Sequence, residues 1–188
     1  DGFGDNWHDD SWNLSRSQWG IGQWLINTTT PDACPFISGY SNQDRFGCPD
    51  NDGDGWSNGD ENWTIMNGSD AFVDEPTQWS DRDFDGWGDN HSEGAKLVDD
   101  FSDNPTQWRD TDGDGWGDNR TYGATQVDDF PFVNSQYRDT DGDGYGDNFT
   151  GFEGDVCVYS TAEEVESGWI SHFDRRGCRE SDMDGYSD

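Results

Sequence analysis

Aspartate residues recur along the chain at a spacing that gathers several carboxylates around one point. The clearest copies are residues 110–119 and 139–148, which read Asp-Thr-Asp-Gly-Asp-Gly, then Trp or Tyr, then Gly-Asp-Asn. Residues 81–90 and 50–58 repeat this segment with small changes, and residues 180–188 begin with Glu in place of Asp. We call these five segments the loops and number positions from their first acid. Alternate carboxylates on a tightly turned segment predict a site for a hard cation.

The loop pattern matches the way in which proteins hold Ca²⁺. Acids stand at positions 1, 3 and 5, Gly at position 6, and Asp or Asn at position 9. Ca²⁺ takes about 6–8 oxygen ligands at ~2.3–2.6 Å, and the Gly permits a sharp turn that brings the position-7 carbonyl towards the ion. The position-7 residue is always Trp or Tyr, so its ring stays free to pack. Residues 1–6 repeat the second half of a loop.

We therefore expect several Ca²⁺ ions per chain, held mainly by carboxylates. The predicted loop ligands, with the aromatic residues acting through their carbonyl oxygens, are Asp1, Asp5, Asp50, Asp52, Asp54, Trp56, Asn58, Glu61, Asp81, Asp83, Asp85, Trp87, Asp89, Asp110, Asp112, Asp114, Trp116, Asp118, Asp139, Asp141, Asp143, Tyr145, Asp147, Glu180, Asp182, Asp184, Tyr186 and Asp188.

Only the loop that begins at Asp50 carries an acid, Glu61, at position 12. The next three loops have Ser or Thr there and need a carboxylate from elsewhere. The candidates lie downstream in an Asp-x-Phe or Asp-x-Cys element. They are Asp99, Asp128 and Asp155, which would tie each loop to the next element through the metal. Asp32 and Asp70 hold the same position in their own repeats and complete the predicted ligand set.

The segments between the loops repeat as well. The loops that begin at Asp81, Asp110 and Asp139 follow one another at steps of 29 residues, and Pro76-Thr-Gln-Trp79 and Pro105-Thr-Gln-Trp108 each precede a loop. These segments carry Pro, Gly and Asn and few aliphatic residues, which argues against the flanking helices of an EF-hand. The loop ring, the Pro-Thr-Gln-Trp ring and the Phe of Asp-x-Phe recur once per unit, so we expect them to cluster between neighbouring units.

Composition narrows the class of protein. The net charge is −32, and Leu, Ile, Val and Phe make up only 26 of 188 residues, so the chain lacks an aliphatic core of ordinary density. No stretch is long and apolar enough for a membrane span. Nucleic acid and anionic lipid are poor partners for so acidic a surface. The 11 Trp residues and the regular repeat nevertheless argue against a disordered chain.

These units resemble thrombospondin type 3 repeats and their microbial surface relatives. The resemblance covers residues 31–188, weakly also 1–6, and is strongest in Asp32-Ala-Cys-Pro35 with Asp44-Arg-Phe-Gly-Cys-Pro-Asp-Asn-Asp-Gly-Asp-Gly55 and in Asp155-Val-Cys157 with Asp174-Arg-Arg-Gly-Cys178. It implies a mostly irregular chain wound as a linear tandem array around calcium ions.

Three features depart from that pattern. Phe84 and Met183 replace the usual Gly at position 4, and Glu180 replaces the first Asp, so we expect weaker binding at these two loops. Residues 7–30, rich in Trp, lie outside the pattern as a degenerate or distinct segment.

The four cysteines form two local pairs inside similar units. This predicts the disulfides Cys34–Cys48 and Cys157–Cys178, one of three possible pairings. A zinc site is the alternative, but no His lies at ligand spacing near these thiols. Disulfides imply an oxidising compartment, so we expect an extracellular, secreted protein.

Asn-x-Ser/Thr sequons are more frequent than the composition predicts by chance. We expect N-linked glycans on this set, with a simple turn role for the asparagine as the alternative: Asn13, Asn27, Asn62, Asn67, Asn90, Asn119 and Asn148. The last three occupy one position in successive units, which would space glycans evenly along the chain.

No residue constellation predicts catalysis, because the three His residues are scattered and calcium loops account for the paired acids. We expect a calcium-binding structural glycoprotein that forms a stalk, surface layer or filament, with head-to-tail contact between copies. One alternative is an adhesin or carbohydrate-binding spacer in which Trp residues contact a glycan. Another is the stalk of a secreted enzyme. The start at Asp1, in mid-loop, indicates a part of a longer protein.

Overall fold

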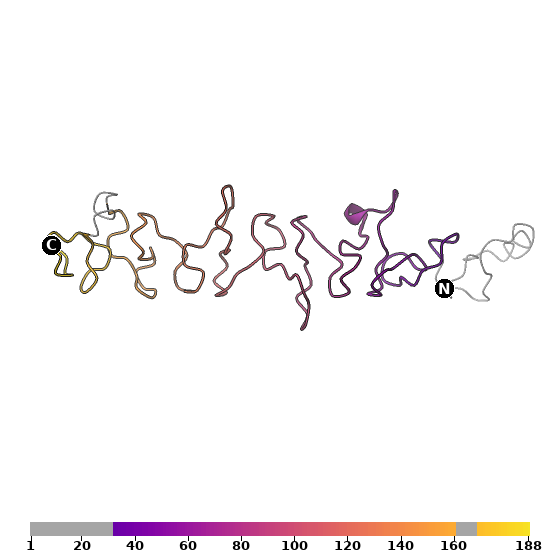
Figure 1. The fold of residues 1–188 in the computed structure, drawn as a ribbon, viewed down its shortest axis with the longest axis horizontal. Helices are drawn as coiled ribbons and strands as arrows, with labels where there is room; N and C mark the ends of the chain where they lie inside the picture. Colours follow the sequence, from indigo (N-terminus) through magenta and orange to yellow (C-terminus); the bar gives the residue numbers. More distant parts are fainter. Residues whose placement is uncertain (1–31, 161–168) are drawn as a thin grey trace, which may run out of the picture. The chain divides into compact units, whose positions relative to one another are not determined.

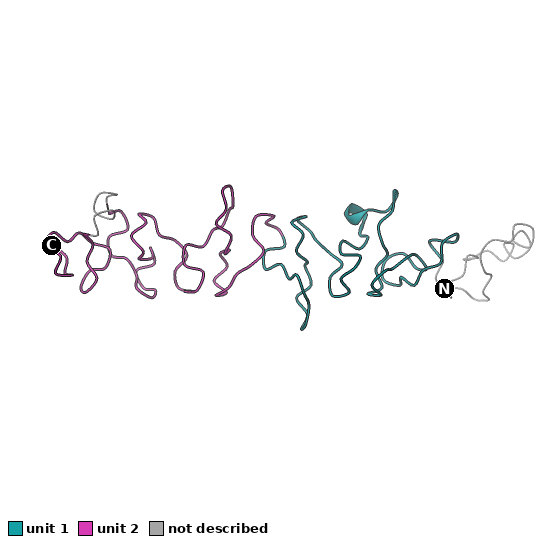
Figure 2. Cartoon of the chain, in the orientation of Figure 1, with its two compact units in different colours: residues 1–102 teal, residues 103–188 magenta. Residues whose placement is uncertain are grey.

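The computed structural model describes residues 32–160 and 169–188. It divides the chain into two compact units, residues 1–102 and residues 103–188, which Figure 2 distinguishes by colour. The partial repeat predicted at residues 1–6 and the Trp-rich segment at residues 7–30 lie outside the described residues.

Regular secondary structure is almost absent from the described part of the chain (Figure 1). It contains one short 3-10 helix, η1, at Ile65–Asn67, and a few isolated β-bridges. Asp, Asn and Gly favour turns, since their side chains bind nearby backbone groups or permit left-handed conformations. The prediction of a mostly irregular chain is confirmed.

In each of the first four loops, a parallel β-bridge pairs a residue near the end of the loop with a residue of the segment that follows it. In unit 1, Asn58 pairs with Asp70 and Gly88 with Val98. In unit 2, Gly117 pairs with Val127 and Gly146 with Gly154. At each bridge the N–H of the downstream aspartate donates to the loop's position-8 carbonyl; the Asp128 N–H, for example, lies 2.9 Å from the Gly117 oxygen. The bridges thus fix a downstream carboxylate beside the loop.

Polar groups dominate the interior of the described residues. The fully or nearly buried apolar side chains there are Cys48, Ile170 and Cys178, whereas the largest buried side chains are glutamines and aspartates. Such an interior has little hydrophobic stabilisation and depends on satisfying its polar atoms.

A buried glutamine holds the end of each of three loops. The Oε1 of Gln107 accepts the Asn119 N–H at 2.9 Å, and its Nε2 donates to the carbonyls of Asn119 and Thr125 at 2.9 and 2.8 Å. Gln78 and Gln136 repeat this arrangement, which we call the glutamine clamp. The clamp needs glycine at position 8, because a Cβ on Gly88, Gly117 or Gly146 would lie 2.1 Å from the glutamine Oε1.

Both predicted disulfides are formed. Cys34 bonds to Cys48 in unit 1, and Cys157 bonds to Cys178 in unit 2. The prediction from local cysteine pairs is confirmed, and two disulfides are typical of extracellular proteins. Among the residues described, no helix has the length and apolar character needed to cross a membrane.

Candidate metal centres

The first acid of each loop closes a tight turn with its side chain. In the loop at residues 110–119, Asp110 accepts the Gly113 N–H at 2.7 Å through Oδ1 and the Gly115 N–H at 2.8 Å through Oδ2. Both glycines have positive φ, 80° and 90°, which they adopt without the Cβ clash of other residues. The same pair of bonds recurs at Asp50, Asp81 and Asp139.

The position-5 aspartate uses only one of its oxygens within the loop. Asp114 Oδ1 accepts the Trp116 N–H at 2.9 Å. Its Oδ2 is buried and has no hydrogen-bond partner in the described part of the chain. The position-5 residues of the other Asp loops, Asp54, Asp85 and Asp143, repeat both features.

Positions 1, 3 and 5 bring their carboxylates together in every loop. One ligand oxygen from each residue lies within 4.8 Å of the others in these five groups: Asp50, Asp52 and Asp54; Asp81, Asp83 and Asp85; Asp110, Asp112 and Asp114; Asp139, Asp141 and Asp143; Glu180, Asp182 and Asp184. Two like charges at such a separation repel by about 3–4 kcal/mol at an effective dielectric of about 20. Each group has the ligand atoms to hold a cation, which would relieve this repulsion.

A further carboxylate joins each of the first four loops from downstream. We call these residues, Asp70, Asp99, Asp128 and Asp155, the closing aspartates; each is at most 2% exposed. In every one, Oδ1 accepts the N–H two residues further on at 2.7 Å. Their Oδ2 atoms are buried, and the described residues offer them no hydrogen bond.

The carboxylates of each loop act electrostatically on the closing aspartate of that loop. Burial raises the pKa of Asp70 to about 7, and the Asp54, Asp52 and Asp50 carboxylates add to the rise. Burial also raises the pKa of Asp99 to about 6 and of Asp128 to about 6, again with loop carboxylates adding to the rise. The pKa of Asp155 is raised from the same causes. Buried, unpartnered oxygens surrounded by like charges are costly unless a cation neutralises them.

The predicted downstream acids Asp99, Asp128 and Asp155 all lie near their loops, whose carboxylates act on them electrostatically. At the first loop the residue that takes this place is Asp70, whereas Glu61, the position-12 acid, is exposed. A role of Glu61 as a ligand stays a prediction. Asp32 accepts the Cys34 N–H at 2.8 Å, as Asp155 does for Cys157. Asp1 and Asp5 lie outside the described residues.

Position-9 side chains bind the residue at position 2 in several loops. Asp118 accepts both the N–H and the hydroxyl of Thr111, at 3.1 and 2.5 Å, and Asp147 does the same with Thr140. Asn58 likewise accepts the Asn51 N–H at 3.2 Å, but its Nδ2 donates to the Asn51 Oδ1 at 2.8 Å. The position-9 residues close the base of the loop, and direct coordination by them stays a prediction.

Two loops keep their turn despite a non-glycine residue at position 4. Phe84 and Met183 have φ of 65° and 62°, in the left-handed region that disfavours side chains. The Phe84 N–H still donates to Asp81 Oδ1 at 2.7 Å. In the last loop, Glu180 is buried and accepts the Gly185 N–H at 2.8 Å.

Two position-7 rings stack on the aromatic residue that stands just before the following loop. Trp56 is parallel to Trp79, with centroids 6.1 Å apart, and Trp116 is parallel to Tyr137 at 4.4 Å. This confirms the predicted pairing of loop rings with rings that precede the following loop. Participation of the Asp-x-Phe rings stays a prediction.

The sequons differ in how their side-chain nitrogens are used. The Nδ2 atoms of Asn90, Asn119 and Asn148 each donate to a backbone carbonyl at 2.8 Å. Asn62 and Asn67 are exposed. Asn13 and Asn27 lie outside the described residues.

The glutamine clamp was not predicted from the sequence. Its signal was present, because Gln78, Gln107 and Gln136 recur at the step of the loops. Comparison with known proteins finds no family model that matches the chain and no match among curated proteins.

Proposed function

We propose that this chain is a calcium-binding extracellular structural glycoprotein, built as a tandem array whose units are joined through the ions. The closing aspartates are the observation that carries this proposal. Each is buried, has an oxygen without a described partner, and lies close enough to the preceding loop for that loop's carboxylates to raise its pKa. A cation bound there would join the loop to the following segment.

Calcium fits this donor set better than the other common biological metals. The gathered ligands are carboxylate oxygens on an irregular loop, which suits the flexible geometry of Ca²⁺. Mg²⁺ requires near-octahedral geometry and usually keeps several waters. Zn²⁺ favours Cys and His in closed structural sites, and all four cysteines are in disulfides.

Calcium would supply the stabilisation that the interior lacks. Each ion brings two positive charges to a group of three or four carboxylates. Because few apolar side chains are buried among the described residues, the free energy of ion binding becomes a large part of the free energy of folding. Each ion would then stabilise its own loop and the next segment together.

A structural role follows from the same features. The array would serve as a secreted stalk, a surface layer or a filament, with N-linked glycans on its surface and head-to-tail contact between copies. We propose no catalytic role for this chain. Linear arrays leave end faces that can pair with another unit, which is the basis for the filament proposal.

A calcium titration of the purified secreted protein tests this function. We expect tryptophan fluorescence and circular dichroism to change cooperatively at about 10⁻⁴–10⁻³ M calcium, the range of extracellular modules. Analytical ultracentrifugation and electron microscopy, with and without EDTA, test assembly. Unchanged spectra and an unchanged sedimentation coefficient after chelation contradict the calcium role. A strictly monomeric calcium-saturated chain contradicts the filament role alone.

A further inference from the structure

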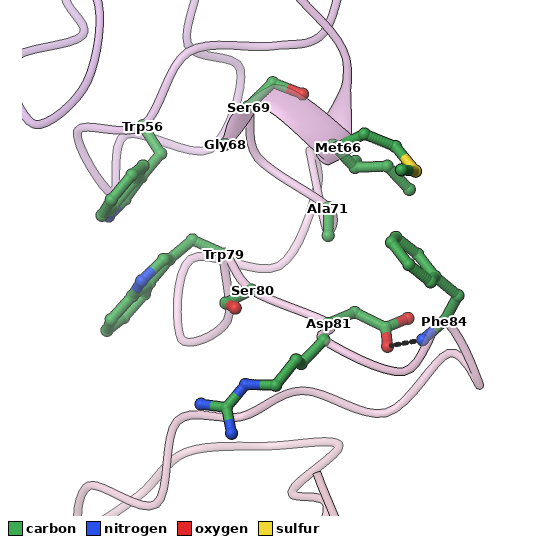
Figure 3. A pocket seen from close by; sticks show the side chains of 11 residues that line it. Trp56, Met66, Gly68, Ser69, Ala71, Trp79, Ser80, Asp81 and Phe84 are labelled. Carbon is green, nitrogen blue, oxygen red and sulfur yellow. Dashed lines mark hydrogen bonds between the residues drawn. The ribbon is translucent and has the colours of Figure 1, made fainter. Parts of the chain in front are cut away.

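A cavity of about 370 Å³ lies beside the first stacked pair of tryptophans in unit 1. Figure 3 shows Trp56 and Trp79 on one side, Met66 and Phe84 on the other, and Ala71 between them. Aromatic and aliphatic side chains therefore form much of the wall, within a chain whose interior is otherwise polar, while Ser69, Ser80, Asp81 and Arg82 line the rest.

Two departures from the repeat build this cavity. The step from Asp50 to Asp81 is longer than the 29-residue step that follows, and the longer segment contains η1, which contributes Ile65 and Met66. Phe84, the second departure, replaces the glycine found at position 4 of three other loops. Both changes place apolar side chains around the same space, although Met66 is 79% exposed and Phe84 50% exposed.

Phe84 is held in an unfavourable conformation for this placement. Its φ is 65°, where Gly53, Gly113 and Gly142 have 83°, 80° and 78°. A side chain in this region costs conformational energy that glycine avoids. Strain of this kind is a reason to look for a function in the side chain that is retained.

The tryptophan pair is also more open than its counterpart in unit 2. The Trp56 and Trp79 rings are parallel within 4°, but their centroids are 6.1 Å apart, against 4.4 Å for Trp116 and Tyr137. The wider pair therefore leaves indole surface towards the cavity that a closer stack would cover.

A predicted glycosylation site, Asn67, is adjacent in sequence to residues that line the cavity, although Asn67 itself does not line it. Asn67 lies between Met66 and Gly68, both of which line it. Its Oδ1 accepts the N–H and the hydroxyl of Thr64, at 3.2 and 3.1 Å. No hydrogen bond within the described part of the chain uses its Nδ2, whereas Asn90 and Asn119 donate theirs to backbone carbonyls.

We propose that this cavity holds the first pyranose ring of an N-linked glycan on Asn67. The inference rests on the proposed glycoprotein nature of the chain. A pyranose presents an apolar C–H face, which suits aromatic walls, and polar edges that stay in water. The ring would cover Trp79, Met66 and Phe84, and so stabilise the segment between the first two loops.

The test uses the full chain, secreted from eukaryotic cells and saturated with calcium. Glycopeptide mass spectrometry establishes whether Asn67 carries a glycan, and an endoglycosidase trims that glycan to one N-acetylglucosamine. We expect Asn67→Gln to lower the melting temperature by about 2–4 °C and to shift tryptophan emission. The matched control is Asn62→Gln, an exposed sequon whose neighbours do not line the cavity.

A second variant separates stacking from a general effect of the glycan. Phe84→Gly removes one wall and its strain, so Asn67→Gln should produce a clearly smaller shift in that background, where only the loss of the Thr64 bonds remains in full. An equal shift in both backgrounds overturns the inference, as does an unoccupied Asn67 or a glycan whose loss changes neither signal. Failure of the calcium proposal is distinct, because it appears as unchanged spectra on chelation in every variant.

A titration with free sugar tests whether the cavity binds a pyranose from solution or only one that is attached to Asn67. The Asn67→Gln protein is titrated with N,N′-diacetylchitobiose while tryptophan emission is recorded. Saturable quenching that Phe84→Gly abolishes supports a pyranose site that accepts free sugar too. No quenching, together with the Asn67→Gln shift, supports the attached glycan alone. Quenching that Phe84→Gly leaves unchanged overturns the assignment to this cavity.

Discussion

Gln107 binds both backbone groups of Asn119 through one side-chain amide. Its Oε1 accepts the Asn119 N–H, and its Nε2 donates to the Asn119 carbonyl, both at 2.9 Å. A third bond reaches the Thr125 carbonyl at 2.8 Å. The side chain is fully buried, so these bonds replace contacts with water that it cannot make. The clamp thus joins three segments without any hydrophobic core.

Gln107→Ala is therefore expected to destabilise unit 2 strongly. The change leaves buried backbone groups without partners and creates a cavity, so we expect a loss of about 2–4 kcal/mol in the free energy of unfolding. Urea unfolding at saturating calcium measures it. Gln43→Ala is the control, because Gln43 is exposed and its amide bonds to the neighbouring Asn42. Equal effects of the two substitutions contradict the clamp's importance.

Gly117→Ala tests the packing of the same clamp from the other side. The added Cβ would lie 2.1 Å from the Gln107 Oε1, so we expect a cost of about 3 kcal/mol. Gly123→Ala should cost about 1–2 kcal/mol through its φ of 92° alone, since open space surrounds it. In a Gln107→Ala background, Gly117→Ala should cost clearly less and Gly123→Ala the same. Full additivity for Gly117→Ala argues against the steric account.

The loops and disulfides follow from sequence because their determinants are local. Asp110 binds the N–H groups of residues three and five positions further on, and Cys34 is only 14 residues from Cys48. Such contacts depend on residue type and short spacing, which the sequence shows directly.

Longer contacts were harder to assign. Glu61 at position 12 and Asp70 in the Asp-x-Phe element are both predicted ligands, and the sequence does not decide which of them serves the first loop. What brings Asp70 in is the Asn58–Asp70 bridge, a backbone pairing that side-chain identity does not reveal. The glutamine clamp could not be predicted from the sequence for the same reason, because its partners are backbone groups of residues with no shared chemistry.

Asp99→Asn tests the closing aspartates directly. The substitution keeps the shape and the bond to the Phe101 N–H but removes the charge beside Asp85 and Asp83. We expect calcium affinity at this loop to fall by about 10–100-fold, as for loss of well-placed metal-site partners. Isothermal titration calorimetry measures it, and Asp100→Asn is the matched control because Asp100 is exposed. Similar affinities for the two variants exclude Asp99 as a ligand.

The metal-free chain should respond to pH in a defined direction. The folded-state pKa is about 7 for Asp70 and about 6 for Asp99 and Asp128, above the ordinary value of 3.8. A raised pKa favours the protonated form in the folded state. Its contribution to stability is therefore full below about pH 4 and is lost as pH rises through 6 to 7.

We accordingly expect the calcium-free protein to be more compact at pH 5 than at pH 8. Small-angle X-ray scattering in metal-free buffer measures the radius of gyration. A triple variant with Asn at residues 70, 99 and 128 should show a weaker dependence, because it lacks these titrating carboxyls. Calcium should reverse the trend, since protons compete with the ion for the same oxygens and affinity falls below about pH 7. A radius that is the same at both pH values without metal would show that these carboxyls do not govern compaction.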